Sequence, residues 1–489
     1  MEEDLIKQRL KKLEELKKLK VNPYPYSFNK RDNSSDLVAE FKSLKNDERT
    51  KRKASIAGRV VALREMGKAS FGHIQDGKGK IQFYIREDEV GEKAYRIFKL
   101  TDLGDIIGIN GYIFKTKTGE VTVRAENYEL LTKGLRPLPE KWHGLKDIEI
   151  RYRKRYLDLI MNPEVKKVFE TREKIIDAIR EFLKSKGFNE VDIPVLQTVY
   201  GGAEAKPFKT HLNALNIDLF LSISPELFLK RLTVGGFDKV FTIARNFRNE
   251  GIDKWHNPEF TMMELYQAYV DYNDMMELFE SIYEYVSKKV FGTTRIKFKD
   301  VILDFKKPWK RMTMANAIKK YADIDVLKME TKELIKFAKD NKVEYKYENW
   351  GWIVAGIFEH FCEEKIVQPT FIMDHPKETS PLCKTHRKDP RLIERFEPFC
   401  MGAELGNAYS ELNDPISQKR LLEEQAQLLK KGDEEAHPYD SDFVEAIEVG
   451  LPPTGGIGLG IDRMIMLLTN SPSIRDVILF PFMKPEKEG

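Results

Sequence analysis

Residues 241–260, FTIARNFRNEGIDKWHNPEF, concentrate charged and planar side chains between two apolar runs that are typical of strands. The polar set consists of Arg245, Arg248, Glu250, His256 and Glu259. Arginine binds carboxylates and phosphates through two parallel hydrogen bonds, and its flat face stacks on aromatic rings. Because a structural turn needs no such groups, we interpret this hairpin as one wall of a site for an anionic ligand.

A glycine-rich run, GLPPTGGIGLGIDRMIMLLTN, occupies residues 450–470. Its glycines would let a ligand approach the backbone closely, although tight packing of a strand on a helix would explain them equally well. Together with the hairpin the signal is stronger, because Arg248, Arg463 and the ring of Phe260 would enclose a purine and its phosphates. The sequence contains neither the P-loop pattern nor the dinucleotide-binding glycine pattern, so those two nucleotide sites are not expected.

Three glutamates recur at intervals of seven residues in RFEPFCMGAELGNAYSELNDP, residues 395–415: they are Glu397, Glu404 and Glu411. The flanking apolar residues fit poorly with an ordinary charged surface, and buried glutamates need partners. Carboxylate oxygens suit Mg²⁺ that bridges to phosphates. The stretch therefore predicts a metal-assisted phosphate site.

Composition limits the class of protein. A chain of 489 residues with 41% apolar residues indicates two or three packed domains. No apolar run is long enough to cross a membrane, and the N-terminus lacks the apolar stretch of a secretory signal. The three cysteines are scattered, which argues against a disulfide framework or a zinc site and favours the cytoplasm.

The pattern of strands and helices predicts an α+β protein with an OB-type barrel. Residues 51–134 carry 16 Lys and Arg against 11 Asp and Glu, which suggests a polyanion bound there, although a merely lysine-rich surface fits equally well.

FNEVDIPVL is expected to be a strand. The predicted parts are an amphipathic helix and lead-in at 1–53, the barrel at 54–132, a linker at 133–150, and a domain around an antiparallel sheet flanked by helices at 151–489, with an inserted subdomain at 292–375. The helix could dock on the body or lie against RNA, but a solvated helical face is the expectation that its charges favour.

These stretches resemble the signature motifs of the class II aminoacyl-tRNA synthetases. FRNE…HNPEF is similar to their motif 2, GIGLGIDR to motif 3, and the helix at 164–187 with GFNEVDIPVL to motif 1. GGAEAKPF, PELFLKRL, FTMMELY and NAYSELNDP resemble the lysyl members of the subgroup that handles aspartate, asparagine and lysine. Several motifs in order along most of the chain are far more specific than any one alone.

The resemblance implies a ligase that works in two steps. ATP and L-lysine would form lysyl-adenylate and pyrophosphate, and the lysyl group would then pass to the 3′ end of tRNA(Lys). Because the carboxylate of lysine is already ionised at neutral pH, no general base or covalent nucleophile is expected. Catalysis then reduces to aligning two anions and neutralising charge on the α-phosphate.

The resemblance also assigns the ATP site. Arg248 would bridge the lysine carboxylate and the α-phosphate, and Arg463 would cover the adenine and hold the γ-phosphate, so both are expected to be catalytic. Glu250 would accept a hydrogen bond from the adenine amino group. His256 would contact the γ-phosphate, and Phe260 would stack on the adenine.

An amino-acid pocket for lysine must hold two ammonium groups, and each needs an anion once it is desolvated. By resemblance, Glu226, Glu264 and the Gly202 carbonyl would bind the α-ammonium. Glu411, helped by the Tyr266 hydroxyl and by Asn407, would bind the ε-ammonium. The lysine-binding set is thus Gly202, Glu226, Arg248, Glu264, Tyr266, Asn407, Tyr409 and Glu411.

The resemblance further assigns Mg²⁺ to Glu397 and Glu404. The sequence departs from the family pattern at Tyr409, where many relatives have phenylalanine, and at Ala403, which replaces a residue that is often basic. Pro398 and Cys400 are also unusual. These departures bear on fine geometry, and the extra hydroxyl of Tyr409 is expected to be tolerated.

In the predicted barrel, Phe71 would stack on an anticodon base, and Gln82 and Glu120 match positions that read uridine edges in the family. Arg64 and Lys68 would hold phosphates. On the residues alone, Phe71 reads as a barrel-core residue.

The resemblance implies a cytoplasmic homodimer with motif 1 at the interface. Three alternatives stay open: an aspartyl- or asparaginyl-type enzyme, a relative that lysylates a protein, and a catalytically silent RNA-binding or scaffold protein. Glu411 opposes the first, because an aspartate-specific enzyme needs a cation at that position. The presence of an anticodon domain opposes the second, and Arg248, Arg463, Glu397 and Glu404 oppose the third.

Overall fold

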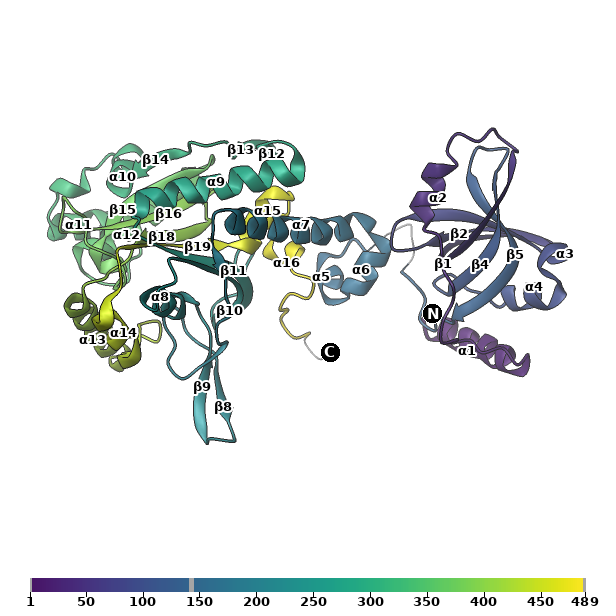
Figure 1. Cartoon of the computed structure of the whole chain (residues 1–489), viewed down its shortest axis with the longest axis horizontal. Coiled ribbons are helices and arrows are strands. Elements are labelled where there is room, and N and C mark those ends of the chain that lie inside the picture. Colours follow the sequence, from purple (N-terminus) through teal and green to yellow (C-terminus); the bar gives the residue numbers. More distant parts are fainter. Residues whose placement is uncertain (1, 140–144, 487–489) are drawn as a thin grey trace. The chain divides into compact units, whose positions relative to one another are not determined.

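The computed structural model describes residues 2–139 and 145–486. The chain divides into two compact units, Met1–Gly144 and Leu145–Gly489. Each unit has its own hydrophobic core, and the helices and strands of both are labelled in Figure 1.

The first unit is a closed barrel with the strand order β1-β2-β3-β5-β4. Its strands are β1 (Arg49–Met66), β2 (Ala69–Gln75), β3 (Lys80–Arg86), β4 (Ile106–Lys115) and β5 (Val121–Thr132). Along β2, Ser70, Gly72 and Ile74 are buried while the residues between them are half-buried, so alternate side chains fill the barrel. The predicted barrel is confirmed.

The N-terminal helix α1 (Glu2–Lys18) is held against the barrel of its own unit. Leu16 is fully buried in the barrel core. Arg9 donates to the Leu103 carbonyl over 2.8 Å, and the ammonium of Lys12 lies 2.6 Å from Asp102. The helix therefore docks on the body, and Lys12 is engaged there. The other helices of this unit are α2 (Ser34–Glu40), α3 (Glu87–Val90) and α4 (Glu92–Phe98).

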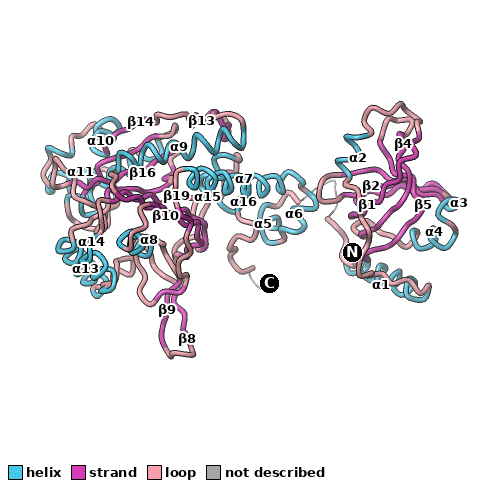
Figure 2. Tube along the Cα trace, in the orientation of Figure 1, coloured by secondary structure: helices cyan, strands magenta, loops and turns pink. Residues whose placement is uncertain are grey.

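The second unit is built on one large sheet of order β14-β15-β16-β18-β19-β11-β10-β6, with β17 paired to β16. Figure 2 shows these strands together inside the unit, with helices around them. Their bounds are β6 (Asn189–Glu190), β10 (Lys239–Phe247), β11 (Glu259–Ala268), β14 (Lys310–Thr313), β15 (Thr370–Pro376), β16 (Leu392–Cys400), β17 (Ala403–Glu404), β18 (Gly406–Ser410) and β19 (Thr454–Gly460). The central strands are antiparallel, as predicted, but β14–β15 and β10–β6 pair in parallel, so the sheet is mixed.

Helices α7 (Pro163–Ser185), α9 (Tyr272–Phe291) and α15 (Ile461–Leu468) cover one face of this sheet. Met263, Leu265, Ile457 and Leu459 point from β11 and β19 into that helical layer, with Phe279 of α9 among their neighbours in the core. The helix predicted at 164–187 is confirmed. Since side chains alternate along a strand, the residues between these apolar ones face the other side.

The remaining elements of the second unit surround this sheet. They are α5 (Ile148–Arg153), α6 (Arg155–Met161), β7 (Leu196–Gln197), β8 (Lys209–Leu212), β9 (Ile217–Leu221), α8 (Glu226–Val234), β12 (Arg295–Phe298), β13 (Val301–Asp304), α10 (Met314–Ala322), α11 (Thr331–Asp340), α12 (Trp350–Phe361), α13 (Pro415–Lys430), α14 (Ser441–Gly450) and α16 (Ile474–Val477), with single 3₁₀ turns at Val326–Lys328, Glu363–Lys365 and Lys377–Thr379.

The structure differs from the sequence prediction at FNEVDIPVL. Only Asn189–Glu190 and Leu196–Gln197 are strands, and the residues between them are irregular. Pro194 has no N–H to offer a ladder, and it restricts the residue before it. A single strand across this stretch was therefore the wrong expectation.

Residues 292–375, predicted as an insert, contribute helices α10, α11 and α12 with a core of their own. The same stretch supplies β14 and most of β15 to the main sheet. Helix α5 begins at Ile148, inside the stretch predicted as a linker. Within the described residues, no helix is long and apolar enough to cross a membrane.

Candidate active site

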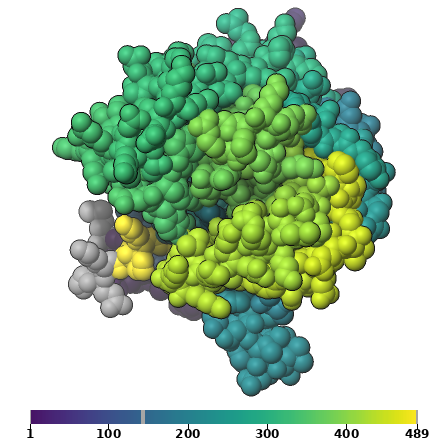
Figure 3. Space-filling view, turned by 90° about the vertical axis from the view of Figure 1, so that its left-hand side faces the viewer, coloured from purple at the N-terminus to yellow at the C-terminus, as the bar shows by residue number. Residues whose placement is uncertain are grey.

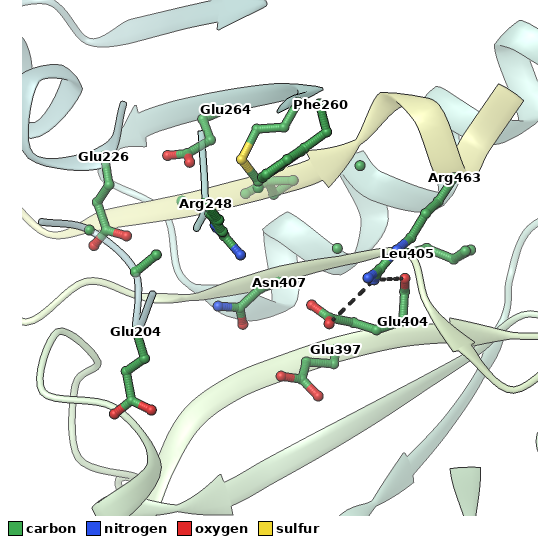
Figure 4. A pocket seen from close by; sticks show the side chains of 18 of the residues that line it. Glu204, Glu226, Arg248, Phe260, Glu264, Glu397, Glu404, Leu405, Asn407 and Arg463 are labelled. Carbon is green, nitrogen blue, oxygen red and sulfur yellow. Dashed lines mark hydrogen bonds and ion pairs between the residues drawn. The ribbon is translucent and has the colours of Figure 1, made fainter. Parts of the chain in front are cut away.

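A cavity of about 300 Å³ lies on the face of the main sheet opposite α7 and α9. Phe260, Met262, Glu264 and Tyr266 line it from β11, alternating with the residues that point into the helical layer. Figure 4 shows its charged side chains converging from different strands and loops. In the space-filling view, the surface is hollowed where green segments meet yellow-green ones (Figure 3).

Two glycines of β19 make room for the cavity between larger residues on the neighbouring strands. Gly456 is paired with Tyr266 on one side and Tyr409 on the other, and Gly458 is paired in the same way with Glu264 and Asn407. A Cβ on Gly456 would lie 2.1 Å from Oε1 of Glu411 and 2.6 Å from the Tyr266 ring. The glycine run thus creates space for side chains that carry charge.

Every residue predicted for the ATP, amino-acid and metal sites lines this one cavity. They are Gly202, Glu226, Arg248, Glu250, His256, Phe260, Glu264, Tyr266, Glu397, Glu404, Asn407, Tyr409, Glu411 and Arg463. They come from β11, β16, β17, β18, α8 and α15 and from the loops between elements. Antiparallel neighbours in the sheet bring together segments that are more than a hundred residues apart in the chain.

The guanidinium of Arg248 lies near the middle of the cavity (Figure 4). It sits 5.1 Å from the centre of the Phe260 ring, and its Nε donates to the Ile223 carbonyl at 3.4 Å. Burial lowers its pKa, although Glu250 and other carboxylates oppose that effect. Within the described residues it forms no ion pair within 4.0 Å, so its outer nitrogens are available to an anionic ligand.

Arg463 joins the helix α15 to the hairpin loop. Its Nη1 lies 3.5 Å from a carboxylate oxygen of Glu404, and its Nη2 lies 3.2 Å from Nε2 of His256. Nδ1 of His256 is 2.8 Å from Asp253. Because arginine only donates, Nε2 must accept, and the proton of His256 belongs on Nδ1. This contact ties the hairpin loop to α15 at the cavity.

Glu397 and Glu404 lie close together below these arginines (Figure 4). Arg395 donates to Oε1 of Glu397 over 2.5 Å. Burial raises the pKa of Glu404, and the negative charge of Glu397 raises it further. No group of three His, Cys, Asp or Glu side chains in the described part of the chain is arranged to hold a metal unaided. A cation here would need oxygens from a ligand as well, which suits Mg²⁺ bound with phosphates.

Glu264 is buried at the other end of the cavity, where it accepts from the Ser224 hydroxyl over 2.8 Å and from the Tyr266 hydroxyl over 3.1 Å. Burial and the nearby charge of Glu226 raise its pKa to about 8. A carboxyl group in this state becomes an anion readily when a cation enters.

Two predicted helpers of Glu411 are engaged elsewhere. The Tyr266 hydroxyl, expected beside Glu411, donates to Glu264, because residues two apart on a strand share a face. The side-chain oxygen of Asn407 accepts from Arg395 over 2.8 Å. The Tyr409 hydroxyl, expected only to be tolerated, donates to Oε1 of Glu226 over 2.6 Å.

Sequence reasoning missed several residues of the site. Lys230 is fully buried and pairs with Glu226 over 2.5 Å and with Glu411. The spacing of Glu226 and Lys230 by four residues on a helix was the available signal. Arg395 and Ser224 had no signal, because their roles depend on strand register and on a turn.

Cys400 is buried, and burial raises its pKa.

The barrel candidates lie on strands of the first unit or, for Lys68 and Glu120, in the turns next to them. Phe71 of β2 is half-buried on the outer side of the barrel, 4.5 Å from the Tyr84 ring, so it is not a barrel-core residue. Gln82 donates to Glu120 over 2.7 Å. Arg64 pairs with Phe71 across β1 and β2. Lys68 lies 3.3 Å from Glu87, on the exposed surface.

Two family models match the chain. The model of class II tRNA synthetases (D, K and N) covers residues 147–484, and that of the OB-fold nucleic acid binding domain covers residues 54–131. The chain belongs to the class II tRNA synthetases of the D, K and N group.

The curated relatives narrow this class. The chain is 52% identical to the lysine–tRNA ligase of Pelotomaculum thermopropionicum, covering 99% of this chain and 96% of the relative. It is 50% identical to that of Thermosipho africanus, covering 98% and 95%, and 51% identical to that of Thermoanaerobacter pseudethanolicus, covering 99% and 97%. Within the class, the chain is a member of the lysine–tRNA ligases.

The raised pKa of Glu264 predicts a pH-dependent effect of Glu264→Gln on stability. An ordinary glutamate has a pKa of 4.5, whereas the pKa of folded Glu264 is about 8. Between these two values the unfolded chain has released a proton that the folded chain still holds, so the free energy of unfolding of the wild type falls as pH rises. Glu264→Gln has no such proton, so its free energy of unfolding should rise relative to that of the wild type by up to about 1.4 kcal/mol per pH unit between these two values. Urea unfolding from pH 5 to 9 measures the difference.

Glu423→Gln, on the exposed side of α13, is the control for this series. It should change the free energy of unfolding by less than about 0.5 kcal/mol. A difference between Glu264→Gln and the wild type that does not vary with pH would contradict the assignment.

Proposed function

We propose that the chain joins L-lysine to ATP as lysyl-adenylate, releases pyrophosphate, and transfers the lysyl group to the 3′ end of tRNA(Lys). The observation that carries this proposal is one cavity with two kinds of charge. Arg248, which has no carboxylate partner among the described residues, lies at its middle, and the buried carboxylates of Glu226, Glu264 and Glu411 lie at one end. An anion flanked by two ammonium groups complements this arrangement.

In the first step, a carboxylate oxygen of lysine attacks the α-phosphorus, and the bond from that phosphorus to the bridging oxygen of the β-phosphate breaks. Pyrophosphate leaves with the electron pair, and no proton needs to be removed from the nucleophile. Arg248 is positioned to hold the lysine carboxylate and the α-phosphate together. Fixed positive charge that meets developing negative charge lowers the barrier without reorganisation.

The purine and the outer phosphates fit the side of the cavity near Arg463. Phe260 offers one flat face to adenine, and the guanidinium of Arg463 offers the other. Glu250, which is exposed at the cavity, accepts from the adenine amino group. His256 and Arg463, which touch each other, contact the γ-phosphate.

The lysine pocket uses the carboxylates opposite Arg463. Glu226 and Glu264 with the Gly202 carbonyl bind the α-ammonium, and Glu411 binds the ε-ammonium. Asn407 lines the wall beside them, the Tyr266 hydroxyl fixes Glu264, and the Tyr409 hydroxyl fixes Glu226. A neutral side chain would leave one oxygen of the buried Glu411 carboxylate without a cationic partner, because Lys230 contacts only the other oxygen, and an uncompensated buried charge is costly.

Mg²⁺ is the cation proposed for Glu397 and Glu404. Its chemistry is to neutralise the phosphate oxygens during transfer. The support is that Glu397 raises the pKa of Glu404, since two facing carboxylates favour a shared cation.

Amino-acid-dependent exchange of pyrophosphate into ATP tests the reaction. Lysine should support exchange in the presence of Mg²⁺, and a chelator should abolish it. Glu411→Gln should lower kcat/KM for lysine by about 10²- to 10⁴-fold, because removing one partner of a buried charge pair typically costs about 3–5 kcal/mol. Glu423→Gln is the control and should exchange like the wild type.

Exchange with aspartate or asparagine in place of lysine would contradict the proposed substrate. Exchange with none of the twenty amino acids would favour a catalytically silent relative. Unchanged lysine preference in Glu411→Gln would remove the pocket assignment while leaving the reaction intact.

We propose that residues 54–132 bind the anticodon and that residues 151–489 form the catalytic domain. Phe71, Gln82, Glu120 and Arg64 are the anticodon contacts. The half-buried outward position of Phe71 supports this, because an accessible ring can stack on a base.

Phe71→Ala should raise KM for tRNA by about 5- to 100-fold, since stacking of a base on an aromatic ring contributes about 1–3 kcal/mol. Aminoacylation of a tRNA transcript measures this value, and lysine-dependent exchange should not change. Tyr26→Ala removes a fully exposed ring from the same unit and should leave both values unchanged. Equal KM values for Phe71→Ala and the wild type would contradict the contact.

A homodimer is proposed through the motif 1 region. A groove of about 420 Å³ runs along Phe169 and Ile176 of α7 to Leu479, and Phe480 and Phe482 beyond it are 74% and 61% exposed. Exposed aromatic residues of this kind mark interaction sites.

The enzyme is also proposed to be cytoplasmic, which its three free, buried cysteines support.

Analytical ultracentrifugation should give about twice the chain mass of 57.0 kDa. Phe480→Asp should shift the equilibrium toward the single chain, because a charge would have to be buried at the interface. Val449→Asp, at an 81% exposed position on α14, is the control and should leave the mass unchanged. A wild-type mass of a single chain at micromolar concentration would contradict the dimer.

A further inference from the structure

We propose that Lys230 is a positioning residue that sets the charge and the orientation of the amino-acid pocket, so that two free anionic positions remain for the two ammonium groups of the substrate. The inference rests on the proposed function, because it names a determinant of selectivity for lysine. It concerns a residue that contacts the binding carboxylates rather than the substrate.

The ammonium of Lys230 is enclosed between two of the pocket carboxylates. Its Nζ lies 2.5 Å from Oε1 of Glu226 and contacts Oε2 of Glu411. Its side chain is fully buried, so the ammonium has no route to bulk water within the folded chain. Lys230 therefore holds one oxygen of each carboxylate and leaves the other oxygen of each for a ligand.

Aromatic side chains fix the position of this ammonium from other elements. The Tyr409 ring centre is 5.4 Å from Nζ, and the ring centres of Tyr266 and Phe443 are 5.9 Å away. These rings come from β18, β11 and α14, and favourable cation–π contact adds to the ion pairs. Lys230 thus ties α8 to the strands that carry the binding residues.

The charge count then matches the substrate. Glu226, Glu264 and Glu411 supply three carboxylates to the buried end of the cavity, and Lys230 supplies one ammonium. When all are ionised, two negative charges remain, and lysine brings two ammonium groups there while its carboxylate meets Arg248. Without Lys230, a third negative charge would be left buried without a partner, which is unfavourable.

The groups around Lys230 shift one another's titration. Burial alone lowers the pKa of Lys230, but Glu226 and Glu411 outweigh that effect and raise it. Burial raises the pKa of Glu411 well above its ordinary value; Lys230 opposes that rise, and the charges of Glu226 and Glu264 add to it. Among the other titratable groups on this side, His437 has a pKa lowered to about 4 by burial and by Lys230, so it is neutral at pH 7. Burial raises the pKa of each of the rest, which are Glu204, Tyr266, Cys383 and Tyr409.

Glu264 differs from the other two carboxylates. It accepts from two hydroxyl groups and has its pKa at about 8, whereas Glu226 and Glu411 are paired with the ammonium. Because the ammonium of Lys230 contacts both Glu226 and Glu411, we expect it to hold their charge, so lysine that enters the pocket at pH 7 should displace about one proton, chiefly from Glu264.

The first measurement is calorimetric titration of the wild-type enzyme with lysine at pH 7, in buffers of different ionisation enthalpy. Release of about one proton is expected. Release of two or more protons would mean that Glu226 or Glu411 is protonated in spite of Lys230, and it would overturn the inference. This result needs no variant, so it stands even if a substitution prevents folding.

The second measurement is lysine-dependent pyrophosphate exchange by Lys230→Met. We expect KM for lysine to rise about 10- to 100-fold, KM for ATP to stay within about twofold, and proton release on lysine binding to exceed that of the wild type. Lys230→Arg retains the charge and should return proton release to the wild-type value. Lys288→Met is the matched control, because Glu284 and Lys288 form the same four-residue pair, 3.0 Å apart, on the exposed side of α9.

A merely structural role for Lys230 would raise both KM values together without a change in proton release, and that result would overturn the inference. So would wild-type values for a folded Lys230→Met. Both outcomes leave lysine-dependent exchange by the wild-type enzyme intact. If the wild type itself fails to exchange with lysine, the proposed function fails first.

Discussion

The burial of charge beside an apolar sheet is the constraint on which this structure depends. One face of β11 and β19 is packed against helices, and the other face carries glutamates, tyrosines and glycines. Each carboxylate withdrawn from water must be protonated, paired or hydrogen-bonded. Glu264 has a raised pKa and accepts hydrogen bonds from two hydroxyl groups. Glu411 forms an ion pair with Lys230.

The register of the strands leaves room for a cavity among these buried side chains. Gly456 and Gly458 lie between tyrosine, glutamate and asparagine side chains on the flanking strands, so the strand between them contributes space instead of bulk. A Cβ on Gly456 would lie 2.1 Å from Glu411, so even an alanine at this position would clash with the binding carboxylate. Positive charge comes from Arg395 on β16 and, outside the sheet, from Arg248 at the hairpin, Arg463 on α15 and Lys230 on α8.

The cations of the site have different roles. Arg248 has no ion pair among the described residues and so remains available to an external anion, whereas Lys230 is fully engaged by internal carboxylates. The barrel unit handles its surface charge in a third way, with basic residues held by nearby acids, such as Lys12 by Asp102. Local pairing, and not total charge, decides which cations can bind a partner.

Spacing and residue type by themselves determined the class of elements, the barrel, the long helix at 164–187, and the arginines and glutamates expected at a phosphate site, whereas the amino-acid pocket was implied only by the resemblance to the class II synthetases. They determined this because strand alternation, helix periodicity and clustered arginines and glutamates are local features of the chain. Only the tertiary structure decided which polar atoms meet. The Tyr266 hydroxyl binds Glu264, Arg395 binds Asn407 and Lys230 joins Glu226 to Glu411, because register and helix docking set those distances to within an ångström.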